Sequence, residues 1–202
     1  MSLPYAVVIA GGKGERLGGV RKADLLLGGR RLVDRVAEAF CPVQLPMMIA
    51  VGPHDDGRGT RQDCIAVTDI SAPVGGPLAG LAATVESLGA RGIRTGLLVS
   101  AAVDAPFLPL DMVARLTASM GGAPAAYAAW GEQFYPPNAV WRLDALQDLP
   151  AQIRSGRAPK SLKALLHGLG AQQANWQGFM EFNPFVNINT VADLVALGKI
   201  AR

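Results

Sequence analysis

Groups that bind zinc or form disulfide frameworks are scarce in this chain. Its two cysteines, Cys41 and Cys64, lack Cys-x-x-Cys spacing, and its two histidines, His54 and His167, lie on quite different segments. This scarcity argues against a zinc site, a disulfide framework and a Ser-His-Asp triad. We therefore expect reduced thiols in a cytoplasmic protein.

Aromatic residues and long runs of one kind are also few. Aromatics make up 6% of the 202 residues, and a net charge of +3 is spread along the chain without a basic tract. Nucleic-acid-binding proteins usually carry a basic stripe interleaved with aromatics, so no nucleic-acid partner is expected. The apolar runs at residues 6–10 and 96–103 are too short to span a bilayer, and no secretory signal is evident. No membrane partner is expected, and the mild positive charge suits a small polyanion.

Half of the residues are apolar, which excludes a disordered chain. Short buried strands are expected at residues 5–9, 47–51, 64–67 and 97–103, alternating with helices at 32–40, 77–88 and 110–120. This alternation predicts an α/β fold, a three-layer α/β/α arrangement with a mostly parallel sheet. Alternation at residues 125–130 and 138–141 predicts an antiparallel excursion in the C-terminal half. Helices are expected afterwards at 144–153, at 161–169 and from Thr190, whose spacing to Asp193 fits a capping box.

The strongest chemical signal is the glycine-rich segment IAGGKGERLGGVRK, residues 9–22, directly after the first expected strand. It holds five glycines and four basic residues. Glycines let backbone N–H groups approach an anion closely, and the Lys and Arg side chains add charge. The composition predicts a polyphosphate-binding loop; the alternative is a plain surface loop. It is neither a dinucleotide fingerprint nor a Walker loop, because G-x-G-x-x-G is absent and Val20 follows Gly19.

A lone carboxylate, Asp104, stands where the strand in VSAAVDAPFLP ends, and Pro106 fixes the turn beyond it. Magnesium binds proteins through one or two carboxylates together with substrate phosphates, so a single aspartate suffices. The alternative is that Asp104 caps the following helix.

Three weaker signals follow along the chain. In VTDISAPVGGPLAGL, Asp69 comes after a strand and Gly76 precedes a helix start, where free N–H groups are presented; Asp69 is equally consistent with a turn or with base recognition. In FVNINT, alternation places two amides on one side of a strand, either for phosphate or as strand-edge groups. The segment IRSGRAPKSLKALL is basic, as a solvated helix face would be.

Together these segments resemble the molybdenum cofactor guanylyltransferase family, within the Rossmann-like nucleotidyltransferases. The first loop resembles the family signature at Ile9, Ala10, Gly11, Gly12, Arg16, Leu17, Gly18, Gly19 and Lys22. The family's Asp-x-Pro turn, its G-P-L-A-G element and its closing V-N-I-N-T are matched at residues 104–109, 76–80 and 186–190. The resemblance runs from about residue 6 to residue 197 in the expected order.

The resemblance implies transfer of GMP from GTP to molybdopterin, with magnesium as cofactor and release of pyrophosphate. The implied catalytic residues are Arg16, Lys22 and Asp104, with Asp104 as the metal ligand. The implied nucleotide-binding residues are Ala10, Gly11, Gly12, Lys22, Asp69, Gly76 and Asp104. The implied acceptor-binding residues are Arg157, Lys160, Asn187 and Asn189. One domain is expected over residues 1–202, with a nucleotide-binding half at about 1–120 and an acceptor-binding half at about 121–202. Transient contact with molybdoenzymes or their chaperones is also implied.

Three positions depart from the family pattern: Arg21 replaces an acidic residue, Val51-Gly52 lacks a base-recognising asparagine, and Tyr135 replaces a histidine. The alternatives are therefore cytidylyl or other nucleotidyl transfer to another phosphorylated acceptor, or a non-catalytic nucleotide-binding homologue. The Ala10-Gly11-Gly12 start favours the guanylyl branch, since relatives that use CTP more often begin A-A-G.

Overall fold

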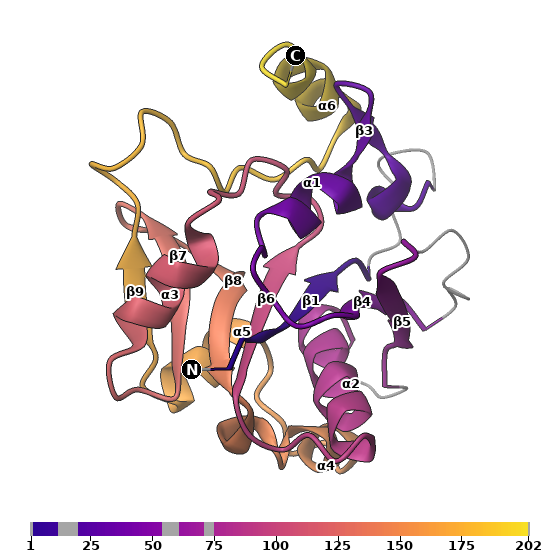
Figure 1. Cartoon of the computed structure of the whole chain (residues 1–202), viewed down its shortest axis with the longest axis vertical. Coiled ribbons are helices and arrows are strands. Elements are labelled where there is room, and N and C mark those ends of the chain that lie inside the picture. Colours follow the sequence, from indigo (N-terminus) through magenta and orange to yellow (C-terminus); the bar gives the residue numbers. More distant parts are fainter. Residues whose placement is uncertain (1, 12–19, 54–60, 71–74, 202) are drawn as a thin grey trace.

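The computed structural model describes residues 2–11, 20–53, 61–70 and 75–201. A seven-stranded sheet in the order β5-β4-β1-β6-β8-β7-β9 runs through the molecule (Figure 1). β8 runs antiparallel to both of its neighbours, and the other adjacent pairs are parallel. The strands are β1 (Tyr5–Ile9), β4 (Met47–Val51), β5 (Cys64–Thr68), β6 (Leu97–Ala102), β7 (Ala125–Trp130), β8 (Gln133–Arg142) and β9 (Gln172–Asn175).

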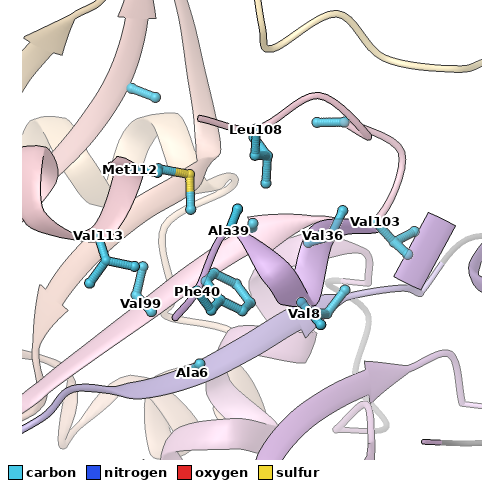
Figure 2. Close-up of a cluster of buried hydrophobic side chains, with 14 of the residues drawn as sticks. Ala6, Val8, Val36, Ala39, Phe40, Val99, Val103, Leu108, Met112 and Val113 are labelled. Carbon is cyan, nitrogen blue, oxygen red and sulfur yellow. The ribbon is translucent and has the colours of Figure 1, made fainter. Parts of the chain in front are cut away.

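Both faces of the sheet are covered by helices. α1 (Leu32–Glu38) and α3 (Met112–Met120) lie on one face, and α2 (Pro77–Ala90), α4 (Leu149–Arg154) and α5 (Leu162–Gly168) lie on the other. β1 shows why its sequence is continuously apolar: Ala6 and Val8 face the first cluster, and Val7 and Ile9 face the second. Figure 2 shows part of the first cluster, with Phe40 packed over β1 and β6. The predicted three-layer α/β/α fold is confirmed.

A segment near the start of the chain and the last helix meet beside this sheet. Lys22–Asp24 form the short helix η2, and β2 (Leu26–Leu27) and β3 (Arg30–Arg31) form a small hairpin. The last helix, α6 (Val191–Gly198), lies beside this hairpin at the top of the view (Figure 1). The predicted capping box is present: Asp193 N donates to Thr190 Oγ1 at 3.1 Å, and Thr190 N donates to Asp193 Oδ2 at 2.9 Å. No helix in the described ranges is long and apolar enough to cross a membrane.

Two local expectations were wrong. The helix expected over residues 144–153 is divided into η3 (Leu143–Leu146) and α4, because Pro150 is tolerated only in the first turn of a helix. The segment at residues 185–190 is not a strand. It is irregular, and Ile188 N donates to the backbone oxygen of Asp104 at 2.8 Å. β9 and the β2–β3 hairpin were not anticipated, because both are short.

The strand order places the two principal motifs side by side. The chain moves outward from β1 to β4 and β5, then returns through α2 to β6 on the other side of β1. Ile9 and Ala102, the last residues of β1 and β6, are register partners, and Val103 N donates to Ile9 O at 3.1 Å. In open α/β sheets, ligands bind outside the carboxyl ends of the strands where the order reverses. The loops that begin at Ala10 and Val103 flank that position.

Candidate active site

Three segments that are distant in sequence meet at the side chain of Lys22. Its Nζ donates to Asp104 Oδ2 at 2.7 Å and to Asn189 Oδ1 at 3.1 Å. The side chains of Lys22 and Asp104 are 18% and 17% exposed, so the ion pair is largely shielded from water. Lys22 at the end of the glycine-rich segment, the Asp-x-Pro turn and the closing V-N-I-N-T segment therefore lie next to one another.

The backbone around this ion pair is held from several directions. Leu25 N donates to Lys22 O at 3.2 Å in η2, which anchors the end of the glycine-rich segment. At Asn189, the backbone N–H donates to Asp193 Oδ2 at 3.0 Å. This hydrogen bond is the largest of the interactions that lower the pKa of Asp193. Asp193, which the sequence marked only as a helix cap, thus also fixes the residue that contacts Lys22.

A second buried carboxylate, Asp69, lies past the end of β5, where its backbone N donates to Val51 O at 3.0 Å. It is 8% exposed, and its Oδ1 has no hydrogen-bond partner among the described residues. Burial raises the pKa of Asp69 to about 6. A Cβ at Gly11 would lie 3.1 Å from Asp69 Oδ2, and a Cβ at Gly80 would lie 3.1 Å from Oδ1. The two glycines therefore leave the space that this carboxylate fills.

Of the other predicted nucleotide-binding and catalytic residues, some lie inside the described ranges and some outside them. Ala10 continues the path of β1, since its N donates to Ala50 O at 2.8 Å. Gly76 precedes α2 with a φ of +75°, a backbone conformation that favours glycine, and Pro77 follows at the first helical position. Gly12 and Arg16 lie outside the described residues.

Oxygen atoms of the kind that magnesium prefers are present on the segments that meet at the ion pair. Asp104 supplies a carboxylate, and the buried Oδ1 of Asn187 has no hydrogen-bond partner among the described residues. Asn187 adjoins Ile188, whose backbone is bonded to Asp104. The described residues include no cluster of three His, Cys, Asp or Glu side chains that could hold a metal by themselves. These oxygens fit a magnesium ion that takes its remaining ligands from substrate phosphates and water.

A pocket of about 280 Å³ lies where the start of α2 faces β8 and the start of α5. It is lined by Gly75, Pro77, Leu78, Pro136, Pro137, Lys160, Ser161, Leu162 and Lys163. Lys163 Nζ also lies 4.7 Å from the centre of the Phe134 ring. Of the two predicted basic acceptor contacts, Lys160 lines this pocket. Arg157 is not among the lining residues, and its Nε donates to Ser155 Oγ at 3.1 Å.

Two of the departures from the family pattern have partners within the chain. Arg21 Nη1 lies 3.5 Å from Asp24 Oδ2, so the added positive charge is offset inside η2. Tyr135 packs its ring 5.2 Å from that of Phe185 and donates its hydroxyl to Gln133 Oε1 at 2.9 Å. Neither side chain displaces Lys22 from Asp104.

Comparison with known proteins agrees with this geometry. Residues 6–174 match the family described as the MobA-like NTP transferase domain. The chain is 34% identical over 198 residues to a molybdenum cofactor guanylyltransferase of Cereibacter sphaeroides, covering 98% of this chain and 97% of that protein. It is 37% identical over 191 residues to one of Acidiphilium cryptum, covering 95% and 92%.

Solved structures share the fold. The molybdopterin-guanine dinucleotide biosynthesis protein A of Archaeoglobus fulgidus superposes with a TM-score of 0.71 at 23% identity, over 97% of each chain. A 2-C-methyl-D-erythritol 4-phosphate cytidylyltransferase of Thermus thermophilus superposes with a TM-score of 0.68 at 21% identity, over 100% of each chain. The fold is thus common to guanylyl- and cytidylyltransferases, and the sequence relatives distinguish between them. The chain belongs to the MobA-like NTP transferases, and within them to the molybdenum cofactor guanylyltransferase family.

Proposed function

We propose that this nucleotidyltransferase transfers GMP from GTP to molybdopterin, with magnesium as cofactor and pyrophosphate as the second product. The observation that carries the proposal is the convergence of Lys22, Asp104 and Asn189 at the carboxyl ends of β1 and β6. A cation, the carboxylate proposed to bind the metal and an amide meet there. These are the groups that a triphosphate requires.

The nucleotide is proposed to lie across the ends of β1, β4 and β5. Gly11 and Gly12 would present backbone N–H groups to it, next to Ala10, whose own N–H is bonded to Ala50 O, and Gly76 would do so at the start of α2. Asp69 would accept hydrogen bonds from the base or ribose, since one buried oxygen of its carboxylate lacks a partner among the described residues. A buried, unpartnered carboxylate is costly to the fold, which supports a role in binding.

Asp104 and Asn187 are proposed to hold the magnesium ion. When bound, magnesium would neutralise negative charge on the triphosphate and the departing pyrophosphate. Lys22 and Arg16 would add positive charge to the same phosphates. Lys22 would exchange its bond to Asp104, where its Nζ lies 2.7 Å from Oδ2, for a bond to phosphate.

The chemical step needs positioning more than it needs a protein nucleophile. A phosphate oxygen of the acceptor attacks the α-phosphorus of GTP in line and forms the new P–O bond. The bond between the α-phosphorus and the bridging oxygen breaks, and pyrophosphate leaves with that electron pair. Lys22 and Arg16 stabilise the charge that builds on the phosphate oxygens. No covalent enzyme intermediate is required.

The acceptor is proposed to lie on the side of β8 and α5. Lys160 lines the pocket there, and Arg157 lies three residues before it on the same segment. Asn187 and Asn189 would border the acceptor phosphate next to Asp104. In this arrangement residues 1–120 hold mainly the nucleotide, and residues 121–202 hold mainly the acceptor.

We also propose that the protein works in the cytoplasm and hands its product to molybdoenzymes or their chaperones. Both cysteines are free thiols, as is usual in a reducing compartment. Copurification of a molybdoenzyme with the tagged protein tests the contact, and fractionation tests the compartment.

A thermal-shift panel tests the nucleotide assignment. GTP, CTP, UTP and ATP are each added with magnesium, and the midpoint of unfolding is recorded. GTP should raise the midpoint most, because a ligand that binds only the folded state stabilises it. Stabilisation by CTP alone would instead make the protein a cytidylyltransferase. No response to any nucleotide would contradict the proposed function.

A further inference from the structure

Asn138 is a buried polar residue in β8 that the proposed mechanism does not use. Its side chain is 1% exposed, in a sheet whose inner positions are otherwise mostly apolar. Its Oδ1 accepts a hydrogen bond from the backbone N of Ala102 at 3.0 Å. Ala102 is the last residue of β6, two positions before Asp104.

The register of β6 and β8 shows where the backbone ladder ends relative to the N–H of Ala102. The two strands pair Leu98 with Trp141 and Ser100 with Ala139, so continuing the ladder would set Ala102 opposite Pro137. The ladder ends at the pair Ser100–Ala139, and the carbonyl oxygen of Pro137 accepts from Ser100 Oγ at 2.8 Å. Beyond that pair, the amide oxygen of Asn138 is the acceptor for the backbone N–H of Ala102.

The three backbone positions that lead to the Asp104 carboxylate are each held by a different element. Ala102 is bonded to Asn138 of β8, and Val103 N donates to Ile9 O of β1 at 3.1 Å. The Asp104 carbonyl accepts from Ile188 N at 2.8 Å. Removing Asn138 would release the β8 side of this arrangement and leave a buried N–H without an acceptor.

We propose that Asn138 is a positioning residue: by fixing the end of β6 it sets the Asp104 carboxylate for Lys22 and for the metal. The inference rests on the proposed function, in which Asp104 holds magnesium. It adds that part of this capacity comes from a residue that touches neither nucleotide nor metal. Ordering by residues behind a metal ligand is a general feature of metal sites.

Calorimetric titration of GTP, with magnesium and with EDTA, tests the inference through binding rather than turnover. Asn138→Ala should bind GTP in EDTA as the wild type does, but lose about tenfold of the gain in affinity that magnesium provides. Asn138→Asp keeps an acceptor oxygen and should retain that gain, even if the buried carboxylate lowers its melting temperature. Asn138→Leu, which keeps the volume and removes the acceptor, answers the same question should the alanine variant fail to fold.

Ser100→Ala is the matched control. Ser100 is fully buried in the same strand pair, where its Oγ donates to Pro137 O and accepts from Trp141 Nε1 at 2.9 Å. This variant loses buried hydrogen bonds but keeps the bond between Ala102 and Asn138, so its magnesium-dependent gain should be retained.

Two results would overturn the positioning role alone. One is a full magnesium-dependent gain in Asn138→Ala and Asn138→Leu. The other is an equal loss in Ser100→Ala, which would indicate general loosening of the strand pair. Wild type and Asp104→Ala are titrated alongside: a wild type without the gain, or an Asp104→Ala variant that keeps it, would overturn the proposed function and this inference with it.

Discussion

The ammonium group of Lys22 donates a hydrogen bond to the Asp104 carboxylate at 2.7 Å, and each side chain is less than one-fifth exposed. Lys22, at the end of the glycine-rich segment, thus already contacts one oxygen of Asp104, the proposed metal ligand. The pair keeps two partly buried charges neutralised, which limits the cost of their desolvation. Binding of a triphosphate with its metal would give each of them a new partner.

Replacement of Lys22 should separate these two roles. Lys22→Ala should weaken GTP binding by about tenfold or more, because a charge-assisted hydrogen bond to phosphate is lost. The same variant should bind Mn²⁺ more tightly in the absence of nucleotide, since Asp104 no longer has a competing cation. Calorimetry with GTP and with Mn²⁺ measures both effects. Lys199→Ala, at an exposed lysine after α6, is the control; a Lys22→Ala variant that matched it in both titrations would contradict this role.

Asp69 should make stability depend on pH in an unusual direction. Burial raises its pKa from 3.8 to about 6, so between these values the folded protein binds more protons than the unfolded chain. Stability contributed by the neutral carboxyl is therefore lost as the pH rises through this window, and the cost remains above it. Asp69→Asn should be more stable than the wild type at pH 7.5 by about 2 kcal/mol and nearly equal at pH 4. It should also bind GTP more weakly.

Melting temperatures at the two pH values check this prediction. Asp63→Asn is the control of opposite sign, because a hydrogen bond from Arg61 leads the interactions that lower the pKa of Asp63. That variant should lose stability at pH 7.5. An Asp69→Asn protein that melts below the wild type at pH 7.5 would show that the carboxylate is not a burden on the fold.

Gly80 should resist replacement although it lies inside α2. Alanine is favoured over glycine in a helix by about 1 kcal/mol, so propensity alone predicts a gain. A Cβ here would, however, lie 2.8 Å from Ala50 Cβ and 3.1 Å from Asp69 Oδ1. Overpacking typically costs about 1–3 kcal/mol, so Gly80→Ala should lower the free energy of unfolding in urea. Gly89→Ala, with only a side-chain atom of Arg94 3.9 Å away, is the matched control and should be neutral or stabilising.

Lys160 should affect the acceptor rather than the nucleotide. It lines the pocket beside β8, whereas Arg157 is exposed outside the lining. Lys160→Ala should raise KM for molybdopterin by about tenfold and leave KM for GTP unchanged, as expected for a lost contact to a charged group. Steady-state kinetics with each substrate varied would measure this. A larger effect from Arg157→Ala would place the acceptor elsewhere on this segment.

The sequence predicted those parts of the fold whose signal is local. β1 and β4 appear with the expected limits because each is a short, continuously apolar run that begins after a proline and ends at or just before a glycine, which is typical of a buried strand. The loops after β1 and β6 meet because these two strands are parallel neighbours, which the structure shows. Their chemistry could be anticipated because glycine, lysine and aspartate are informative residue types there.

What the sequence could not supply depends on register and on distant partners. The role of Asn138 arises from a bond between its side chain and the backbone of Ala102 on another strand, which no local pattern specifies. The residues around Asn187 were expected as a strand, yet they are held by one bond to Asp104 and by the Asp193 cap. The alternation of residue types around Asn187 indicated which side chains would share a side. Whether such a segment forms a strand, however, depends on pairing with a neighbouring strand.

Release of pyrophosphate on mixing the protein with GTP, magnesium and molybdopterin measures the proposed reaction itself. Release should require all three components and should fall by about 10³-fold in Asp104→Ala, in line with removal of a group that stabilises transition-state charge. Asp144→Ala, at an exposed carboxylate paired with Arg142, should act as the wild type does. Wild-type protein that releases no pyrophosphate from this mixture, or Asp104→Ala that releases it at the wild-type rate, would contradict the account.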